Sequence, residues 1–216
     1  MGLFAMVLFA HSPQAGPEIP QGWFAAGDMP DSYEMGVVEI QTSTSIQMQK
    51  IITQNKDFAS SNRVATIKSI DKKIKGFGTL MQNCQSGNYL GKRVRMSGYM
   101  KTENVNKWAG FWFRVDGKRM GDVLAFDNMY DGKKNRSIKG TSDWTKYEIV
   151  LDIPSSATNL AYGALLGGTG QIWFDNITFE IVDNSVSTTG YTNDKKESQA
   201  PEKIYYANPT NLDFEK

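Results

Sequence analysis

Apolar and polar side chains alternate along several stretches between residues 62 and 183, and this period of two constrains the fold more than any other feature. In the segment 108–116, WAGFWFRVD, one side of the alternation is apolar and the other carries an indole and two charges. The two sets are Phe111, Phe113 and Val115 against Trp112, Arg114 and Asp116. Segments 93–101 and 146–152 repeat the pattern. Such alternation is typical of half-buried β-strands.

The segment 171–182, QIWFDNITFEIV, is rich in β-branched and aromatic residues and has no interior glycine or proline. These properties predict a central strand. Its mostly apolar side is expected to face the core. That side consists of Trp173, Asp175, Ile177, Phe179 and Ile181.

Turn signals separate the predicted strands. Asp-Gly pairs follow residues 115 and 130, and the segment 167–170 reads GGTG; these residues supply the positive φ angles of hairpins. No segment between 62 and 183 keeps helical periodicity for three turns, while 46–52 stays open between helix and strand. Many short strands with regular turns predict an all-β fold, specifically an antiparallel β-sandwich.

The chain has one histidine, His11, and one cysteine, Cys84, in 216 residues. Residues 12–216 therefore lack the imidazole used by serine and cysteine nucleophiles and by most transition-metal sites. A single cysteine forms neither an intrachain disulfide nor a cysteine-ligated zinc site. A glycosidase needs two carboxylates facing each other across a cleft, which a small sandwich rarely offers. We therefore expect a protein that is not an enzyme.

The formal net charge is +1, from 24 basic and 23 acidic residues. This balance predicts neither nucleic-acid binding nor attachment to a membrane surface. The apolar run 3–10 is too short to span a bilayer but fits the apolar part of a secretion signal. We expect a secreted or periplasmic protein, and the alternative is a cytoplasmic one with an unstructured N-terminus.

Four regions follow from these patterns. Residues 1–21 form the apolar leader, 22–183 the sandwich, and 184–203 a polar linker. Residues 204–216 are an arm in which apolar side chains return, with Ile204, Tyr205, Tyr206, Leu212 and Phe214. We expect this arm to dock on the sandwich and cover a sheet edge.

Several strings resemble an uncharacterised bacterial domain family. They are GFGTLMQ (76–82), WAGFWFRVDG (108–117), LAFDNM (124–129), IKGTSDWTKYEIVLDIP (138–154), NLAYGALLGGTGQIWFDNITFEIVD (159–183) and NPTNLDFEK (208–216). Members of that family occur alone behind a secretion signal or joined to other domains, including helix-turn-helix regulators. The family is similar to galactose-binding-like jelly rolls, as in carbohydrate-binding modules. The resemblance implies a jelly roll, but not a ligand. Residues 41–61 and 130–135 depart from the pattern.

Flat aromatic rings beside bidentate polar groups are typical of sugar-binding surfaces. The outward set Trp112, Arg114 and Asp116 meets this description, and Gln82 and Tyr99 are candidates on neighbouring strands. In the alternative interpretation, Trp112 packs under a loop or the arm, and Arg114 pairs across the strand.

Three Asx residues are further candidates. Asp127 and Asn128 lie at a strand end, where they either form a turn with the backbone or bind a ligand or calcium. Asp175 is expected inside, where a carboxylate needs backbone N–H groups, an arginine or a calcium ion. The resemblance to carbohydrate-binding modules makes this calcium structural. No other cofactor is expected.

Two functions remain open. The first is a non-catalytic module that binds carbohydrate or a related polar ligand on an exposed sheet face. The second is a structural or regulatory interaction domain, a sensor or accessory subunit, whose partner is another protein. An exposed Trp112 in a groove favours the first, and a buried Trp112 or a flat apolar patch favours the second.

Overall fold

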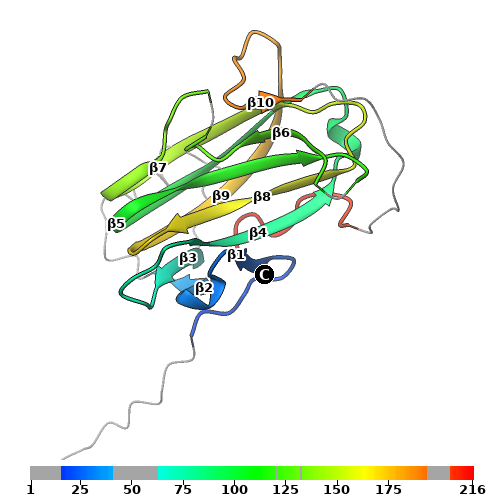
Figure 1. Ribbon diagram of the computed structural model, residues 1–216. Helices are drawn as coiled ribbons and strands as arrows, with labels where there is room; N and C mark the ends of the chain where they lie inside the picture. The colour runs from blue at the N-terminus through cyan, green and yellow to red at the C-terminus, as the bar shows by residue number, and fades with distance from the viewer. Residues whose placement is uncertain (1–15, 41–62, 120, 132, 194–204) are drawn as a thin grey trace, which may run out of the picture.

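The computed structural model describes residues 16–40, 63–119, 121–131, 133–193 and 205–216. In these ranges the chain forms strands and two short 3-10 helices (Figure 1). The strands are β1 (Phe24–Gly27), β2 (Tyr33–Glu39), β3 (Arg63–Ser69), β4 (Phe77–Gln85), β5 (Arg93–Asp116), β6 (Val123–Asp127), β7 (Ile138–Asp152), β8 (Asn159–Gly167), β9 (Gln171–Val182) and β10 (Tyr191–Thr192); the helices are η1 (Pro30–Ser32) and η3 (Gly87–Tyr89). The leader and residues 46–52 lie outside the described residues.

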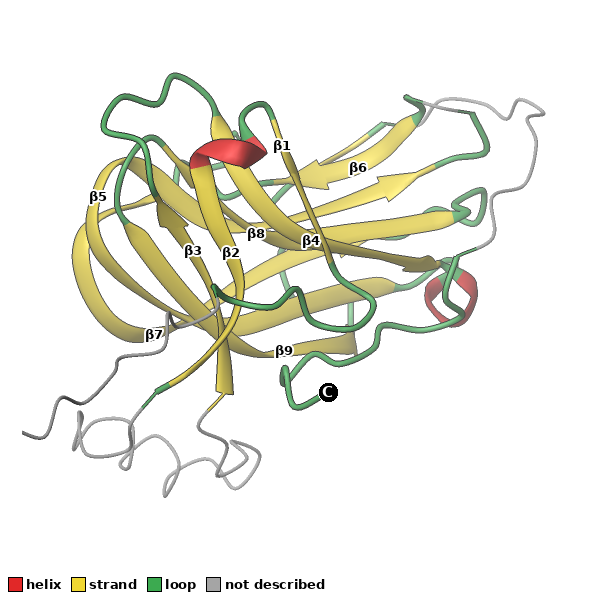
Figure 2. Ribbon diagram, turned by 90° about the horizontal axis from the view of Figure 1, so that it is seen from below, coloured by secondary structure: helices red, strands yellow, loops and turns green. Residues whose placement is uncertain are grey.

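Two layers are built around β5, whose two ends belong to different sheets. Its first part pairs with β7 and β9, and β9 continues to β3 and β2; we call this the back sheet. Its last part, from Trp108 to Asp116, pairs with β8 and β6. The front sheet therefore has the order β1-β4-β8-β5-β6-β10. Figure 2 shows β5 curving from one layer to the other at one end of the molecule. The fold is an antiparallel β-sandwich of the jelly-roll type, as predicted.

The alternation predicted for residues 93–101 and 108–116 is confirmed, although both segments belong to the same 24-residue strand. Register shifts against β7 between Met100 and Ala109 allow the strand to bend from one sheet to the other. Apolar side chains from both ends of β5 meet in one core. They are Val94, Met96 and Met100 from the back sheet and Phe111, Phe113 and Val115 from the front sheet.

The prediction for β9 is only half correct. Ile177 and Phe179 pack into the core, but Trp173 lies on the outer side of the back sheet and Ile181 is 51% exposed. Ile181 keeps the alternation of Ile177 and Phe179 and is exposed near the end of the strand. The outward position of Trp173 has a different cause, an irregularity in the middle of the strand. Asn176 has a φ angle of 50°, and the register against β5 shifts by one residue there. Before this point the inward side chains are therefore Ile172 and Phe174.

Residues 205–216 lie along the opening between the front and back sheets, and the chain ends there (Figure 2). The backbone of Tyr206 forms a bridge with Cys84 of β4, and Leu212 accepts a hydrogen bond from the amide of Ile177 in β9. Phe214 is fully buried. This segment, the C-terminal arm, thus completes the core between the layers. Of the predicted linker 184–203, the structure describes residues 184–193, in which β10 pairs with β6.

Candidate functional site

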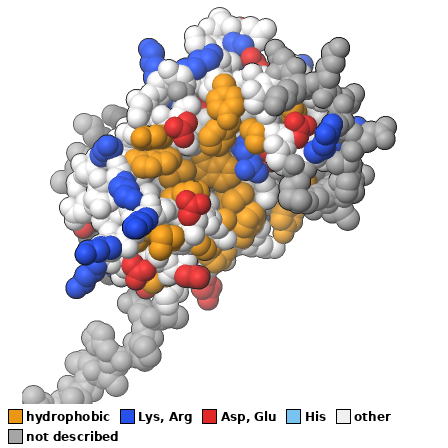
Figure 3. All heavy atoms as spheres, in the orientation of Figure 1, with side chains coloured by type: hydrophobic (Ala, Val, Ile, Leu, Met, Phe, Trp, Pro, Cys, Tyr) orange, Lys and Arg blue, Asp and Glu red, His pale blue; other side chains and the backbone are white. Residues whose placement is uncertain are grey.

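The outer side of the front sheet carries the aromatic and charged residues that the sequence analysis singled out. Strand register places them in rows that cross the sheet. One row contains Phe24, Met81, Gly163 and Trp112; the next contains Asn83, Ala161, Arg114, Phe126 and Tyr191; the third contains Gln85, Asn159 and Asp116. Apolar side chains gather at the centre of this face (Figure 3).

Trp112 lies in the centre of the face but is only 7% exposed. Its indole N–H donates a hydrogen bond of 2.8 Å to the hydroxyl of Thr79, which lies two strands away on β4. The ring therefore crosses β8, where it packs with Ala161 and Leu165. Trp112 is thus a structural element of this face, and its indole does not offer a free stacking surface. This burial is the outcome that favours the interaction domain, so a sugar site on this face has to rest on other aromatic rings.

Four polar side chains form a chain of contacts on three adjacent strands. Arg114 donates from Nη2 to Oδ2 of Asp116 at 3.0 Å, and its Nε lies 2.8 Å from Oδ1 without suitable hydrogen-bond geometry. Asn159 Nδ2 donates to Asp116 Oδ2 at 2.9 Å and to Asn83 Oδ1 at 3.3 Å. Among the described residues, Arg114 Nε and Asn159 Oδ1 are buried without a hydrogen-bond partner. This polar row therefore has one unused donor and one unused acceptor.

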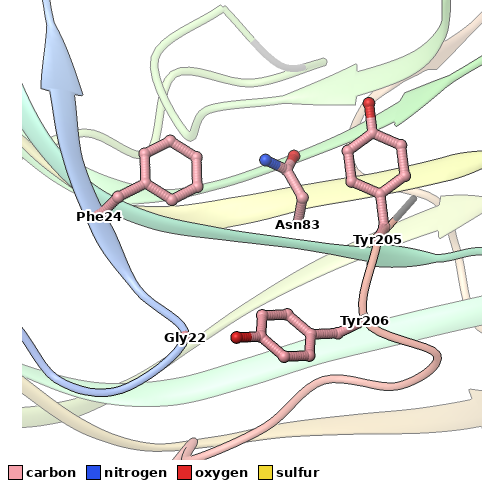
Figure 4. Close-up of a pocket in the computed structure, with 5 residues that line it drawn as sticks. All are labelled: Gly22, Phe24, Asn83, Tyr205 and Tyr206. Atoms are coloured by element: carbon pink, nitrogen blue, oxygen red, sulfur yellow. The ribbon is translucent and has the colours of Figure 1, made fainter. Parts of the chain in front are cut away.

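A pocket of about 430 Å³ opens at the end of the polar row where Asn83 lies. Its walls come from three parts of the chain, namely Gly22 and Phe24, Asn83 of β4, and Tyr205 and Tyr206 of the C-terminal arm. Figure 4 shows the Asn83 amide between the rings of Phe24 and Tyr205, with the ring of Tyr206 directed toward Gly22. Phe24 is 41% exposed and Tyr206 is 53% exposed, so their rings are accessible.

Tyr205 connects the pocket to the charged end of the polar row. Burial and the nearby carboxylate of Asp116 raise the pKa of its hydroxyl, and the guanidinium of Arg114 partly opposes this effect. The hydroxyl therefore stays protonated at neutral pH and remains a donor. We call the pocket and the polar row together the front-face site; it consists of Phe24, Asn83, Arg114, Asp116, Asn159, Tyr205 and Tyr206.

The structure brings together three predicted candidates, Trp112, Arg114 and Asp116, but places the others elsewhere. Gln82 points into the core, because inward and outward positions alternate along β4; its amide binds Tyr162 and Thr210. Tyr99 lies on the back sheet, packed with Val64, because β5 changes sheets between Tyr99 and Trp112. Neither side chain belongs to the front-face site.

Asp127 and Asn128 form the turn of the alternative interpretation. Asp127 is fully buried, accepts a hydrogen bond from the amide of Met129 and forms an ion pair with Arg136. Asn128 accepts hydrogen bonds from the amides of Tyr130 and Asp131. Their oxygens serve the local backbone, so the ligand role predicted for them has no support in this geometry.

Asp175 is 4% exposed, as predicted for a carboxyl on an inner strand. Its Oδ1 accepts a hydrogen bond from the amide of Asn176 at 2.7 Å. Burial, with smaller contributions from Glu215 and Asp213, raises the pKa of this carboxyl to about 8. Nowhere in the described part of the chain do three or more histidine, cysteine or carboxylate side chains gather as a metal site would require. The structural calcium at Asp175 stays a prediction.

No family model matches the chain. A curated relative from Bacillus subtilis (strain 168), the uncharacterised HTH-type transcriptional regulator YbfP, is 36% identical over 195 residues. The match covers 90% of this chain but 57% of that protein, so the chain spans little more than half of the relative. Within the described ranges, no helix is long and apolar enough to cross a membrane.

Solved structures of distant sequence share the fold. The enzymatically active domain of tailspike protein 4 from bacteriophage CBA120 aligns with a TM-score of 0.52 and 10% identity, over 75% of this chain and 20% of that one. The Stig cyclase Fisc from Fischerella sp. TAU aligns with a TM-score of 0.51 and 12% identity, over 81% of this chain and 93% of that one. Carbohydrate-binding modules align at TM-scores of 0.42 to 0.46, too low to support an inference. At these identities the likeness concerns the fold alone.

Proposed function

We propose that this chain is a non-catalytic binding module and that its front-face site receives a carbohydrate or a related polyhydroxyl ligand. The observation that carries the proposal is the pocket of about 430 Å³, in which three aromatic rings surround the Asn83 amide at the end of the polar row. Ligand pockets of this kind combine apolar walls with a few placed polar groups.

The chemistry of the site suits a neutral ligand rich in hydroxyl groups. The apolar face of a sugar ring packs on exposed aromatic rings such as those of Phe24 and Tyr206. Sugar hydroxyls both donate and accept, so they match the mixed amide, carboxylate and guanidinium groups of the polar row. The charges of Arg114 and Asp116 compensate each other within 3.0 Å, which removes any preference for a charged ligand.

Isothermal titration calorimetry with a panel of soluble oligosaccharides tests the proposal. We expect at least one sugar to bind, with affinity at least tenfold lower for Tyr206→Ala and for Asn83→Ala. Tyr191→Ala is the matched control, because Tyr191 is an exposed aromatic residue on the same face but at the opposite edge of the sheet. The assignment would be refuted if no sugar in the panel binds, or if a sugar binds to both site variants with the same affinity as to wild type.

The similarity to the regulator from Bacillus subtilis favours a second role, as the sensing part of a longer protein. In this interpretation, ligand binding at the front-face site is the signal and another segment contacts DNA. Deleting the matched segment from that regulator should then leave DNA binding intact and abolish its response to the ligand. Loss of DNA binding in the same deletion would instead assign the matched segment to DNA recognition.

The two roles imply different compartments. The apolar run 3–10 supports export, which we propose for the isolated module, whereas a regulator acts in the cytoplasm. Cell fractionation with mass spectrometry of the mature N-terminus distinguishes them. Cleavage before residue 22 is expected for the exported form, and an intact leader in the cytoplasmic fraction would contradict export.

A further inference from the structure

The C-terminal arm contributes two walls of the pocket and is itself held against the core. The Phe214 ring lies 5.1 Å from the ring centre of Trp23 and 5.3 Å from that of Phe174. The backbone oxygen of Leu212 accepts a hydrogen bond of 3.1 Å from the amide of Ile177. Tyr206 is held by its own backbone bridge to β4, and the docking of residues 210–214 holds the rest of the same segment in place.

Acidic groups surround this docking point. Asp175 is buried in β9, two residues before Ile177, and the arm carries Asp213 and Glu215 on either side of Phe214. The negative charges of both arm residues act on Asp175. A cation of the neighbouring strand β3, Arg63, donates from its guanidinium to the backbone oxygen of Glu215 at 3.2 Å, and its charge acts on the Glu215 carboxylate.

On β5, Tyr99 is paired with Asp175. The next charged residue of β5, Lys101, lies over the Trp173 ring, 5.5 Å from the ring centre. Lys101 is therefore engaged on the outer side of the back sheet, away from the docked arm. An ionised Asp175 would be a buried charge whose lost hydration is not replaced, and the exposed carboxylates of Asp213 and Glu215 would add repulsion.

We propose that the neutral form of Asp175 holds the C-terminal arm against the sandwich and that ionisation of this carboxyl loosens the arm, which makes the pocket walls responsive to pH. The part of the proposal that concerns arm docking rests on the buried position of Asp175 between Phe174 and Ile177, which contact the arm. Its consequence for ligand binding rests on the proposed function of the front-face site.

The direction of the effect follows from linkage. The docked carboxyl has a pKa of about 8; if undocking exposes it to water, its pKa returns toward the ordinary value of 3.8. Docking is therefore strongest below about pH 4 and weakens as the pH rises toward 8, by at most about tenfold per pH unit; above pH 8 it stays constant.

Hydrogen exchange of the full chain between pH 5 and pH 9, corrected for intrinsic rates, tests the proposal without any ligand. Three amides report on docking, namely Thr210, which donates to Gln82, and Gln85 and Ile177, which donate to the arm. Their protection should fall with rising pH up to about pH 8. Asp175→Asn should keep them protected throughout, and Asp213→Asn with Glu215→Gln should make the dependence weaker.

Glu103→Gln, at an exposed carboxylate of β5, is the matched control and should behave as wild type. Protection that is independent of pH in wild type, or that falls equally in Asp175→Asn, overturns the proposal. A sugar that binds equally well at pH 6 and pH 8 while the amides respond would overturn the link between the arm and the pocket. The amide measurements decide the docking mechanism whether or not any sugar binds.

Discussion

The side-chain amide of Gln82 pairs with the backbone of Thr210 through two hydrogen bonds, 3.1 Å from Nε2 to the carbonyl oxygen and 2.8 Å from the Thr210 amide to Oε1. The same Oε1 also accepts a hydrogen bond from the hydroxyl of Tyr162. A fully buried side chain of β4 thus substitutes for a neighbouring strand and fixes the C-terminal arm. This arrangement explains why a polar residue occupies an inward position of the front sheet.

Gln82→Leu should lower the free energy of unfolding by about 1–3 kcal/mol, because it leaves the Tyr162 hydroxyl and the Thr210 amide without their buried acceptor. Urea denaturation followed by fluorescence measures the loss. Gln85→Leu is the matched control. The Gln85 amide contacts Tyr205 in an exposed position, so this substitution should cost less than about 0.5 kcal/mol. Equal losses in the two variants would argue against the pairing.

Phe214→Ala should cost about 3–5 kcal/mol, the range for truncating a fully buried phenylalanine. The side chain packs against Trp23, so the variant should also change tryptophan emission. Tyr206 belongs to the same arm but is more than half exposed, so Tyr206→Ala should leave the unfolding midpoint unchanged. If Phe214→Ala unfolds like wild type, the arm is not part of the core.

Asp175→Asn should stabilise the protein at pH 8 and have no effect near pH 4. The raised pKa of about 8 means that the wild-type free energy of unfolding falls as the pH rises between these values, by about 1.4 kcal/mol per pH unit at most. The neutral amide removes this part of the dependence. Denaturation curves of both proteins at pH 4, 6 and 8 provide the comparison. If the free energies of unfolding of wild type and Asp175→Asn change equally with pH, the prediction is wrong.

The thiol of Cys84 should not react with iodoacetamide in the native protein at pH 8. It is fully buried, and burial raises its pKa to about 12, so almost no thiolate forms. In denaturant the same reagent should modify one cysteine per chain. Mass spectrometry before and after denaturation measures both states; rapid native modification would mean that the arm beside Cys84 opens readily.

The sequence predicted the β-sandwich because its longest strands are half buried, which gives a period of two. The prediction of which side chains face inward failed where strand pairing departs from that period. At Asp175 and Asn176 an irregularity changes which side chains of β9 face inward, and it depends on the register against Tyr99, which is a long-range contact. The bend of β5 is also invisible locally, because a strand that crosses between sheets keeps the same alternation.

The front-face site was predictable only in part. Arg114 and Asp116 lie on one strand and point the same way, so periodicity alone groups them. Phe24, Asn83 and Tyr205 come from distant parts of the chain, and only tertiary pairing brings them together. The return of apolar residues at 204–206 indicated docking of the arm, but nothing in the residue pattern indicated where its tyrosines would lie.

One consequence of β5 concerns the mechanics of the molecule. In a sandwich the interdigitated core side chains hold the two layers together, and a strand shared by both layers adds a covalent connection. Here a single continuous backbone carries Tyr99 in one layer and Arg114 in the other, so twist imposed on either end is transmitted along covalent bonds. A change of register in the bend of β5 would therefore alter both faces of the protein.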